Sequence, residues 1–160
     1  MATVVSTVRA AKKTLVVNSA FLQEIKESHP EFWHTLHNVR QVCEDMDEPS
    51  HVTRNLVRLL NDLRDQMSLQ FALEEAYGYI EVAPEFSSSK VNAAEKAMAQ
   101  HCSLYLQLSE LIEKAEELQY RGANAACVQE LVDQTQAFDE KLREHEQAEN
   151  GLIEGSLNAG

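Results

Sequence analysis

The sequence has little glycine, proline or aromatic character, and these shortages limit the folds it can adopt. Five glycines, three prolines and 6% aromatic residues occur among its 160 residues. Sheet proteins are richer in aromatic residues, whereas the abundant Ala, Leu, Glu and Gln favour helices. A chain of this length can bury one hydrophobic core. The composition therefore predicts an all-α protein with one core.

Positive charge is scarce, with 14 Lys and Arg against 26 Asp and Glu and a formal net charge of -12. Phosphate binding needs clustered Lys and Arg, so the balance speaks against nucleic acid or an anionic membrane as a partner. No apolar run approaches the ~20 residues that span a bilayer, and no secretory signal pattern follows the N-terminus. We expect a cytoplasmic protein.

The cysteines also exclude some classes of protein. Cys43, Cys102 and Cys127 form no CxxC pair and are odd in number, so neither a zinc knuckle nor a disulfide framework is indicated. We expect them to be small core residues in a reducing compartment. The chain also has no Gly-rich phosphate loop, Ser/His/Asp order or Cys nucleophile motif, so nothing supports a hydrolase or transferase.

The N-terminus differs from the rest, because the first 23 residues contain Arg9, Lys12 and Lys13 and no acid. A short arm packed on the helices is the favoured interpretation, and a mitochondrial transit peptide is the alternative. The predicted organisation is an arm over 1–18, a helical domain over 19–155 and a tail over 156–160.

Apolar residues recur at alternating steps of three and four in four segments, a pattern typical of amphipathic helices. The first predicted helix spans 19–47 with Ser19 as its cap, and the second spans 51–81. A third includes Ala94 and closes at 121–124, and a fourth continues to Asn150–Gly151 or a little beyond. Short connections between them predict an up-down-up-down four-helix bundle.

Each apolar stripe also contains polar residues, and their positions are related. His29 lies 20 residues before the turn at Pro49, and Gln70 and Glu74 lie 21 and 25 after it. In the other pair of helices, His101 lies 21 residues before the turn at Gly122, and 23 and 27 residues after that turn come His145 and Glu149. Since helices rise ~1.5 Å per residue, these side chains are predicted to meet in one layer.

This layer has the chemistry of a metal site. Burial of Glu74 and Glu149 as unpaired anions would cost several kcal/mol, and no Lys or Arg lies on the stripes at that height. A single histidine on an apolar stripe is more often a satisfied core residue, but three in one layer with two carboxylates favour a bound cation. Imidazole and carboxylate donors without thiolate favour iron or manganese over structural zinc.

Four motifs, KESHPEFWHTL, QFALEEAYGY, AQHCSLYLQL and REHEQAENGL, resemble those of hemerythrin-like (HHE cation-binding) domains over about residues 19–155. The resemblance implies a four-helix bundle with a non-heme diiron centre that binds O2 or another small diatomic or peroxide ligand. It also implies a set of metal ligands in which the two carboxylates bridge the ions: His29, Glu74, His101, His145 and Glu149.

Two positions depart from the family pattern, because Gln70 and Tyr105 stand where it has histidines. An amide oxygen or a phenolate is the donor left at these positions. We expect one or two irons and a protein that binds or senses oxygen, related redox ligands or iron. The alternative is a metal-free, degenerate bundle that acts as a regulatory or interaction module, with Gln70 donating to Glu74 or Tyr105.

The remaining polar residues have simpler interpretations. Glu75 and Glu146 lie one step off the stripes, where a solvated face is favoured over an outer hydrogen bond or a replacement ligand. Solvent-facing or capping roles are predicted for His34, His37 and His51. Leu104, Leu108, Phe71 and Tyr105 are predicted to be walls of the pocket.

Overall fold

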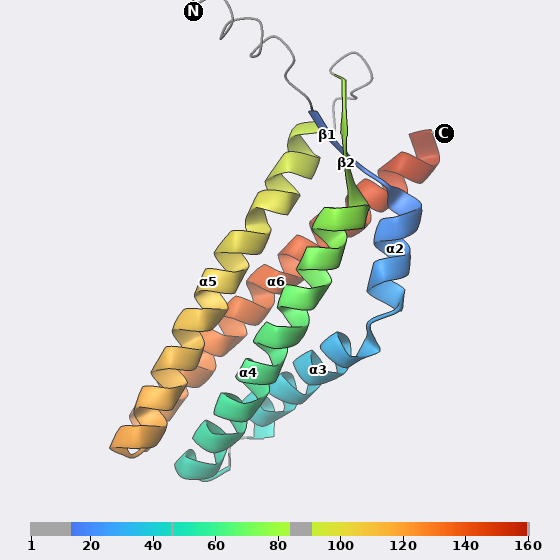
Figure 1. Cartoon of the computed structure of the whole chain (residues 1–160). Helices are drawn as coiled ribbons and strands as arrows, with labels where there is room; N and C mark the ends of the chain where they lie inside the picture. Colours follow the sequence, from blue (N-terminus) through green and yellow to red (C-terminus); the bar gives the residue numbers. More distant parts are fainter. Residues whose placement is uncertain (1–13, 46, 84–90, 160) are drawn as a thin grey trace, which may run out of the picture.

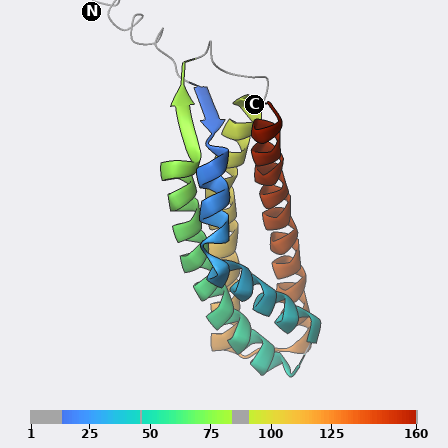
Figure 2. The same cartoon turned by 90° about the vertical axis from the view of Figure 1, so that its right-hand side faces the viewer.

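The computed structural model describes residues 14–45, 47–83 and 91–159, and most of these are helical, which confirms the all-α prediction. Figure 1 shows α4 (Pro49–Leu73), α5 (Val91–Arg121) and α6 (Ala125–Ala159) running side by side. Helix α3 (Pro30–Asp45) crosses the lower half of α4 and reaches α6 (Figure 2). No helix in these ranges is long and apolar enough to cross a membrane.

The predicted continuous helix over 19–47 is wrong, because it breaks into α2 (Ser19–Glu27) and α3. Pro30 begins α3, and proline both lacks the N–H that a helix interior needs and keeps the preceding residue out of helical geometry. His29 therefore lies at the bend. Asn18, not Ser19, caps α2, since its side chain accepts a hydrogen bond from the Phe21 amide at 3.3 Å.

The predicted helix over 51–81 also ends early. After α4 comes a π-helical turn, η1 (Glu74–Gly78), and then the strand β2 (Tyr79–Val82). A π turn takes in an extra residue, so the apolar stripe shifts. Tyr77, which lies three residues after Glu74 and so on the inward stripe of a continuous α-helix, is 60% exposed, whereas Tyr79 is buried. A Cβ on Gly78 would lie 2.8 Å from Leu22 Cδ1, so this glycine allows α2 to pack closely on η1.

A small antiparallel sheet, which the sequence did not predict, joins β1 (Thr14–Val17) to β2, pairing Thr14 with Val82 and Val17 with Tyr79. Strand β1 also contacts α5 and α6. Residues 14–17 of the predicted arm therefore pack on the helices. Residues 1–13, which hold the basic cluster of the transit-peptide alternative, lie outside the described part.

The α5–α6 connection agrees with the prediction of a close at 121–124. Gly122 has φ of 96°, a left-handed conformation that favours glycine, and the Asn124 side chain accepts from the Cys127 amide at 2.9 Å. Helix α6 passes through Asn150 and Gly151 and continues to Ala159.

The main apolar core lies among α3, α4, α5 and α6, below the polar layer. Of the three cysteines, only Cys43 belongs to it, so the prediction that all are core residues is wrong for the exposed Cys102 and Cys127. A smaller apolar cluster lies near the sheet, on the other side of the polar layer. Its buried members are Leu22, Tyr79, Ala94, Ala97, Leu152 and Ile153.

Candidate metal centre

Four buried side chains from three elements meet in the interior. Glu74 comes from η1, His101 from α5, and both His145 and Glu149 from α6. One ligand atom from each lies within 4.8 Å of the other three. Opposite ligands of one transition-metal ion are ~4.2 Å apart, twice a bond of ~2.1 Å. Small side-chain shifts are therefore enough to bring all four atoms onto one ion.

The convergence expected from equal distances to the two turns is confirmed for these four residues. None of their side chains is more than 4% exposed. Helix geometry therefore places them at one height in the interior, and their role as metal ligands stays a prediction.

Three atoms of this cluster have no hydrogen-bond partner: Glu74 Oε1, His101 Nε2 and His145 Nε2. His101 Nε2 is 3.0 Å from Glu74 Oε1, and His145 Nε2 is 3.2 Å from Glu149 Oε1. Although these distances are short enough for hydrogen bonds, the direction of each ring nitrogen relative to the carboxylate oxygen is not that of a donor. Because buried polar atoms almost always have partners, three converging atoms without one fit a cation-binding site.

The outer ring nitrogens are held by polar groups. His101 Nδ1 is 2.9 Å from Glu75 Oε2, and His145 Nδ1 is 2.8 Å from Gln100 Oε1. Both partners are acceptors, so Nδ1 donates, and each ring in its neutral form would present the lone pair of Nε2 to the cluster. Metal-binding histidines are usually oriented in this way. The outer hydrogen bond considered for Glu75 is therefore observed, although its side chain is also 47% exposed.

Lys26 corrects the expectation that no basic residue reaches this layer. Its Nζ donates to Glu149 Oε1 at 2.8 Å and to Glu146, and it lies 3.7 Å from Glu74 Oε2. Burial opposes the charged form, but the carboxylates of Glu146, Glu149 and Glu74 raise the pKa of Lys26 above its usual range. Lys26 is on α2, one step off the apolar stripe, next to the buried Ile25.

Glu146 was predicted to lie on a solvated face, but only 12% of its side chain is exposed. Burial raises the pKa of Glu146 to about 7, against the opposing charge of Lys26. Burial likewise raises the pKa of Glu74. For Glu149, burial is outweighed by His101, His145 and Lys26, which lower its pKa. Three buried carboxylates therefore share one ammonium.

Protons can supply part of the missing positive charge. Burial disfavours the charged form of His101, but the carboxylates of Glu149, Glu74 and Glu75 outweigh it and raise the pKa of His101 to about 10. In the metal-free protein, this imidazole is therefore protonated near neutral pH.

Tyr79 completes the surroundings of Glu149, because its hydroxyl donates to Glu149 Oε2 at 2.7 Å. Burial and the nearby carboxylates raise the pKa of Tyr79 above its usual range, so it acts as a neutral donor. The spacing of apolar residues does not indicate this role, because the π turn places Tyr79 and not Tyr77 on the buried side.

His29 and Gln70 lie beside the cluster but outside it. His29 Nδ1 is 3.0 Å from Gln70 Oε1, and Gln70 Nε2 donates to Glu74 Oε2 at 2.8 Å. The amide oxygen proposed as a ligand is thus directed at His29. Both residues are buried, and together they hold the oxygen of Glu74 that faces away from the imidazoles.

Tyr105, the other candidate ligand, is 43% exposed and is not in the cluster. It lines an outer cavity of about 370 Å³ that also touches Glu75, His101 and Cys102. The predicted wall residue Phe71 does contact the site, since its ring stacks on His101 with centroids 3.9 Å apart. Leu104 and Leu108 are buried in the main core. His34, His37 and His51 are exposed, as expected.

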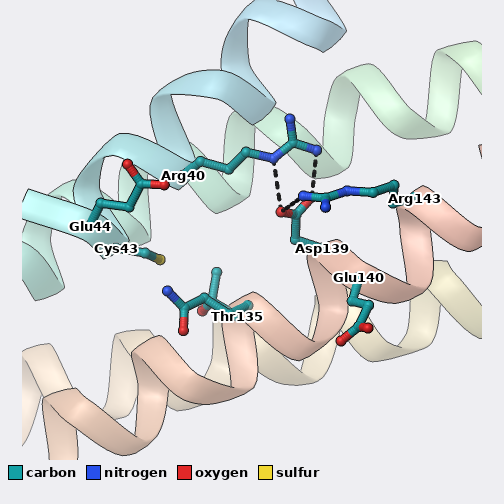
Figure 3. A pocket seen from close by; sticks show the side chains of 8 residues that line it. Arg40, Cys43, Glu44, Thr135, Asp139, Glu140 and Arg143 are labelled. Carbon is teal, nitrogen blue, oxygen red and sulfur yellow. Dashed lines mark hydrogen bonds and ion pairs between the residues drawn. The ribbon is translucent and has the colours of Figure 1, made fainter.

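A second buried acid lies lower in the molecule and is arranged differently (Figure 3). Asp139 on α6 accepts two hydrogen bonds from Arg40 on α3, both of 2.8 Å, and one of 3.3 Å from Arg143. These residues and Cys43 line a cavity of about 370 Å³. Both carboxylate oxygens of Asp139 are thus satisfied by guanidinium groups.

Comparison with protein-family models, curated proteins and solved structures gives no match at the level that indicates a relationship. The hemerythrin-like resemblance therefore stays a prediction that rests on the residues of this chain. The function has to be argued from the geometry and chemistry of the cluster itself.

Proposed function

We propose that the protein binds a transition-metal cation through Glu74, His101, His145 and Glu149. The observation that carries the proposal is the set of unpartnered buried atoms, Glu74 Oε1, His101 Nε2 and His145 Nε2, in a cluster only 4.8 Å across. A bound cation would give each of these atoms a partner. The hydrogen bonds from Nδ1 to Glu75 and Gln100 already orient both rings for this role.

The charges in the layer support the same proposal. The carboxylates of Glu74, Glu146 and Glu149 face the single ammonium of Lys26. With all three carboxylates ionised and both imidazoles neutral, two negative charges in the interior would have no counter-charge, and unpaired buried charge is costly. One divalent cation would balance them.

Iron is the metal that we propose, with manganese as the closest substitute. Two imidazoles with two carboxylates are donors that suit these ions, and the three free cysteines lie outside the cluster. Bound ferrous iron would supply a redox-active centre for oxygen, nitric oxide or peroxide, so sensing of such a ligand or of iron is the proposed role. Free thiols also fit a reducing compartment such as the cytoplasm.

We also propose that the helices form the up-down-up-down four-helix bundle of the hemerythrin-like family, with α2 and α3 together as the first helix. The packing of α3 on α4, α4 on α5 and α5 on α6 supports this arrangement. The bend at Pro30 is the main departure from a straight bundle. An experimental structure of the metal-bound protein would test it.

Anaerobic titration of the purified protein with ferrous iron, followed by desalting and metal analysis, tests the proposed function. We expect retained iron, with binding weakened more than about tenfold in Glu149→Gln, since loss of even an outer partner typically costs that much. Asp139→Asn is the matched control, because it removes a buried carboxylate on the same helix outside the cluster. Failure of the wild-type protein to retain iron would overturn the proposal.

The second candidate function is a metal-free regulatory or interaction module. The observation that favours it is the position of His101 Nε2, which lies 3.0 Å from Glu74 and 3.4 Å from Glu149. These carboxylates raise the pKa of His101, so a protonated ring would join Lys26 in neutralising them. The link from Gln70 to Glu74 is the contact expected of such a network. If it is the native state, a chelator will leave the denaturation midpoint unchanged and added iron will not bind.

A further inference from the structure

We propose that the Lys26 ammonium takes the position of a second cation, so that the centre holds one metal ion and not two. This inference rests on the proposed metal-binding function and specifies its stoichiometry. It is carried by the arrangement of the carboxylates between Lys26 on one side and the two imidazoles on the other.

Glu74 shows this two-sided arrangement most clearly. Its Oε1 lies 3.0 Å from His101 Nε2 and has no hydrogen-bond partner, so it is available to a cation held by the imidazoles. Its Oε2 accepts from Gln70 and lies 3.7 Å from Lys26 Nζ. One oxygen therefore faces the proposed metal position, and the other faces the ammonium.

Lys26 makes the contacts that a second metal ion would make. A carboxylate that bridges two metals contacts both, and Glu149 Oε1 here lies 3.2 Å from His145 Nε2 and 2.8 Å from Lys26 Nζ. The ammonium also contacts Glu146, which adds a third carboxylate to its surroundings. A second divalent ion among the same oxygens would lie a few ångströms from a fixed positive charge and be repelled by it.

The backbone of Lys26 is held in place, so the ammonium is not a chance surface contact. Its carbonyl accepts from Trp33 Nε1 at 3.2 Å, across the bend between α2 and α3. At the start of α2, the Asn18 amide donates to the Gly78 carbonyl at 2.8 Å, and Leu22 packs on Gly78. The break at Pro30 and the glycine in η1 therefore together direct the Lys26 side chain into the layer.

His29 is consistent with a single ion. Although the family resemblance makes it a ligand, it is not among the four residues whose donor atoms converge. Its Nδ1 is occupied by Gln70 Oε1. On the side of the carboxylates that faces Lys26, the described partners are therefore the Lys26 ammonium and the Gln70 amide, and no imidazole is directed there as a ligand for a second ion.

Manganese binding followed by native mass spectrometry and electron paramagnetic resonance tests this inference. We expect wild-type protein at saturating Mn²⁺ to hold one ion with the hyperfine pattern of an isolated metal. Lys26→Met removes the ammonium and should admit a second ion, which gives the broadened spectrum of a coupled pair. Lys114→Met is the matched control, since Lys114 bonds only to Gln134 at the surface in the described contacts, and it should hold one ion.

The outcomes separate this inference from the function on which it rests. If the wild-type protein binds no ion, both the proposed metal binding and the proposed role of Lys26 are wrong. Two ions in the wild-type protein, or one ion in Lys26→Met, would overturn the role of Lys26 and leave metal binding intact. If Lys26→Met does not fold, Lys26→Gln keeps an amide donor to the carboxylates without the charge, and a second ion is again expected.

Discussion

Two buried charge sites join α6 to the N-terminal helices, and they differ in how completely they are satisfied. At the lower site Asp139 meets Arg40 and Arg143, and both of its oxygens accept guanidinium hydrogen bonds. At the upper site three carboxylates meet one ammonium, and two carboxylate oxygens and two ring nitrogens have no hydrogen-bond partner. At the lower site the one carboxylate has its full set of cationic partners, whereas at the upper site carboxylates outnumber ammonium groups.

The difference also follows the burial of the two sites. The Arg40 side chain is 36% exposed, so water screens the lower pair, whereas Glu74 and Glu149 are fully buried and Lys26 is 10% exposed. The Arg40–Asp139 pair has the features of a structural ion pair, because each charge has an opposite partner. The upper site leaves buried carboxylate charge unpaired, which is costly, and a bound cation would remove that cost.

The largest expected effect is the loss of Lys26 from the metal-free protein. Breaking a buried ion pair by removing one partner typically costs 3–5 kcal/mol, so Lys26→Met should lower the free energy of unfolding by about 4 kcal/mol. Chemical denaturation in the presence of a chelator measures it. A loss no larger than that of Arg40→Met would remove the contrast between the sites.

Cation binding should have the next largest effect. A ligand present at about one hundred times its Kd stabilises the folded state by about 2.7 kcal/mol, so Mn²⁺ at that excess should raise the free energy of unfolding by this amount. A chelator should reverse the gain, and in Glu149→Gln, whose Kd should be at least tenfold higher, the gain should fall to about 1.4 kcal/mol or less. Asp139→Asn should keep it in full; an equal gain in Glu149→Gln would show that the ion binds elsewhere.

Removal of the lower pair should cost less. Arg40→Met leaves Asp139 with Arg143 and surrounding water, so we expect a loss of about 1.5 kcal/mol, near the value for hydrogen bonds to charged groups. This loss should be the same with and without Mn²⁺, as measured by parallel denaturation curves. A dependence on the metal would mean that the two sites are coupled through α6.

A substitution at Glu75 should affect metal binding, through the orientation of His101, without affecting the stability of the metal-free protein. Its carboxylate holds His101 Nδ1 but is half exposed, so Glu75→Gln should weaken Mn²⁺ binding roughly tenfold, as for other outer partners of histidine ligands. The stability of the metal-free protein should change little. Isothermal titration with denaturation of the same samples distinguishes the two effects, and Glu110→Gln, which changes an exposed acid on the same helix as His101, serves as the control.

The smallest effect concerns the thiol beside the lower site. Burial and the charges of Asp139 and Glu44 raise the pKa of Cys43 to about 11, so about 0.1% of it is thiolate at pH 8. Alkylation at that pH should modify the exposed Cys102 and Cys127 and spare Cys43. Faster labelling of Cys43 in Arg40→Met would show that the ion pair keeps this region closed.

Local sequence patterns were sufficient for most of the helices and for one part of the site. The alternation of apolar residues located α4, α5 and α6, and the equal spacing from two turns brought Glu74, His101, His145 and Glu149 together. Both predictions work because helix rise and periodicity are properties of the local backbone. Neither depends on knowing which distant side chain is the neighbour.

The predictions failed where a local irregularity changed the phase of a helix. Pro30 broke the first helix, although a proline two residues after Ser28 is a visible signal that could have been used. The π turn after Leu73 carried no such signal. It replaced Tyr77 with Tyr79 on the buried side and gave Glu149 its hydroxyl partner.

By itself, the sequence determined an acidic, helical protein with an inward layer of histidines and carboxylates, because composition and periodicity act through the local backbone. Only the tertiary structure decided how that layer is neutralised. Lys26 and Glu149 are 123 residues apart, and their contact depends on the angle between α2 and α6 and on the reach of a flexible side chain. No periodic pattern encodes that contact, since a long side chain beside a stripe reaches inward or outward according to the charges it meets.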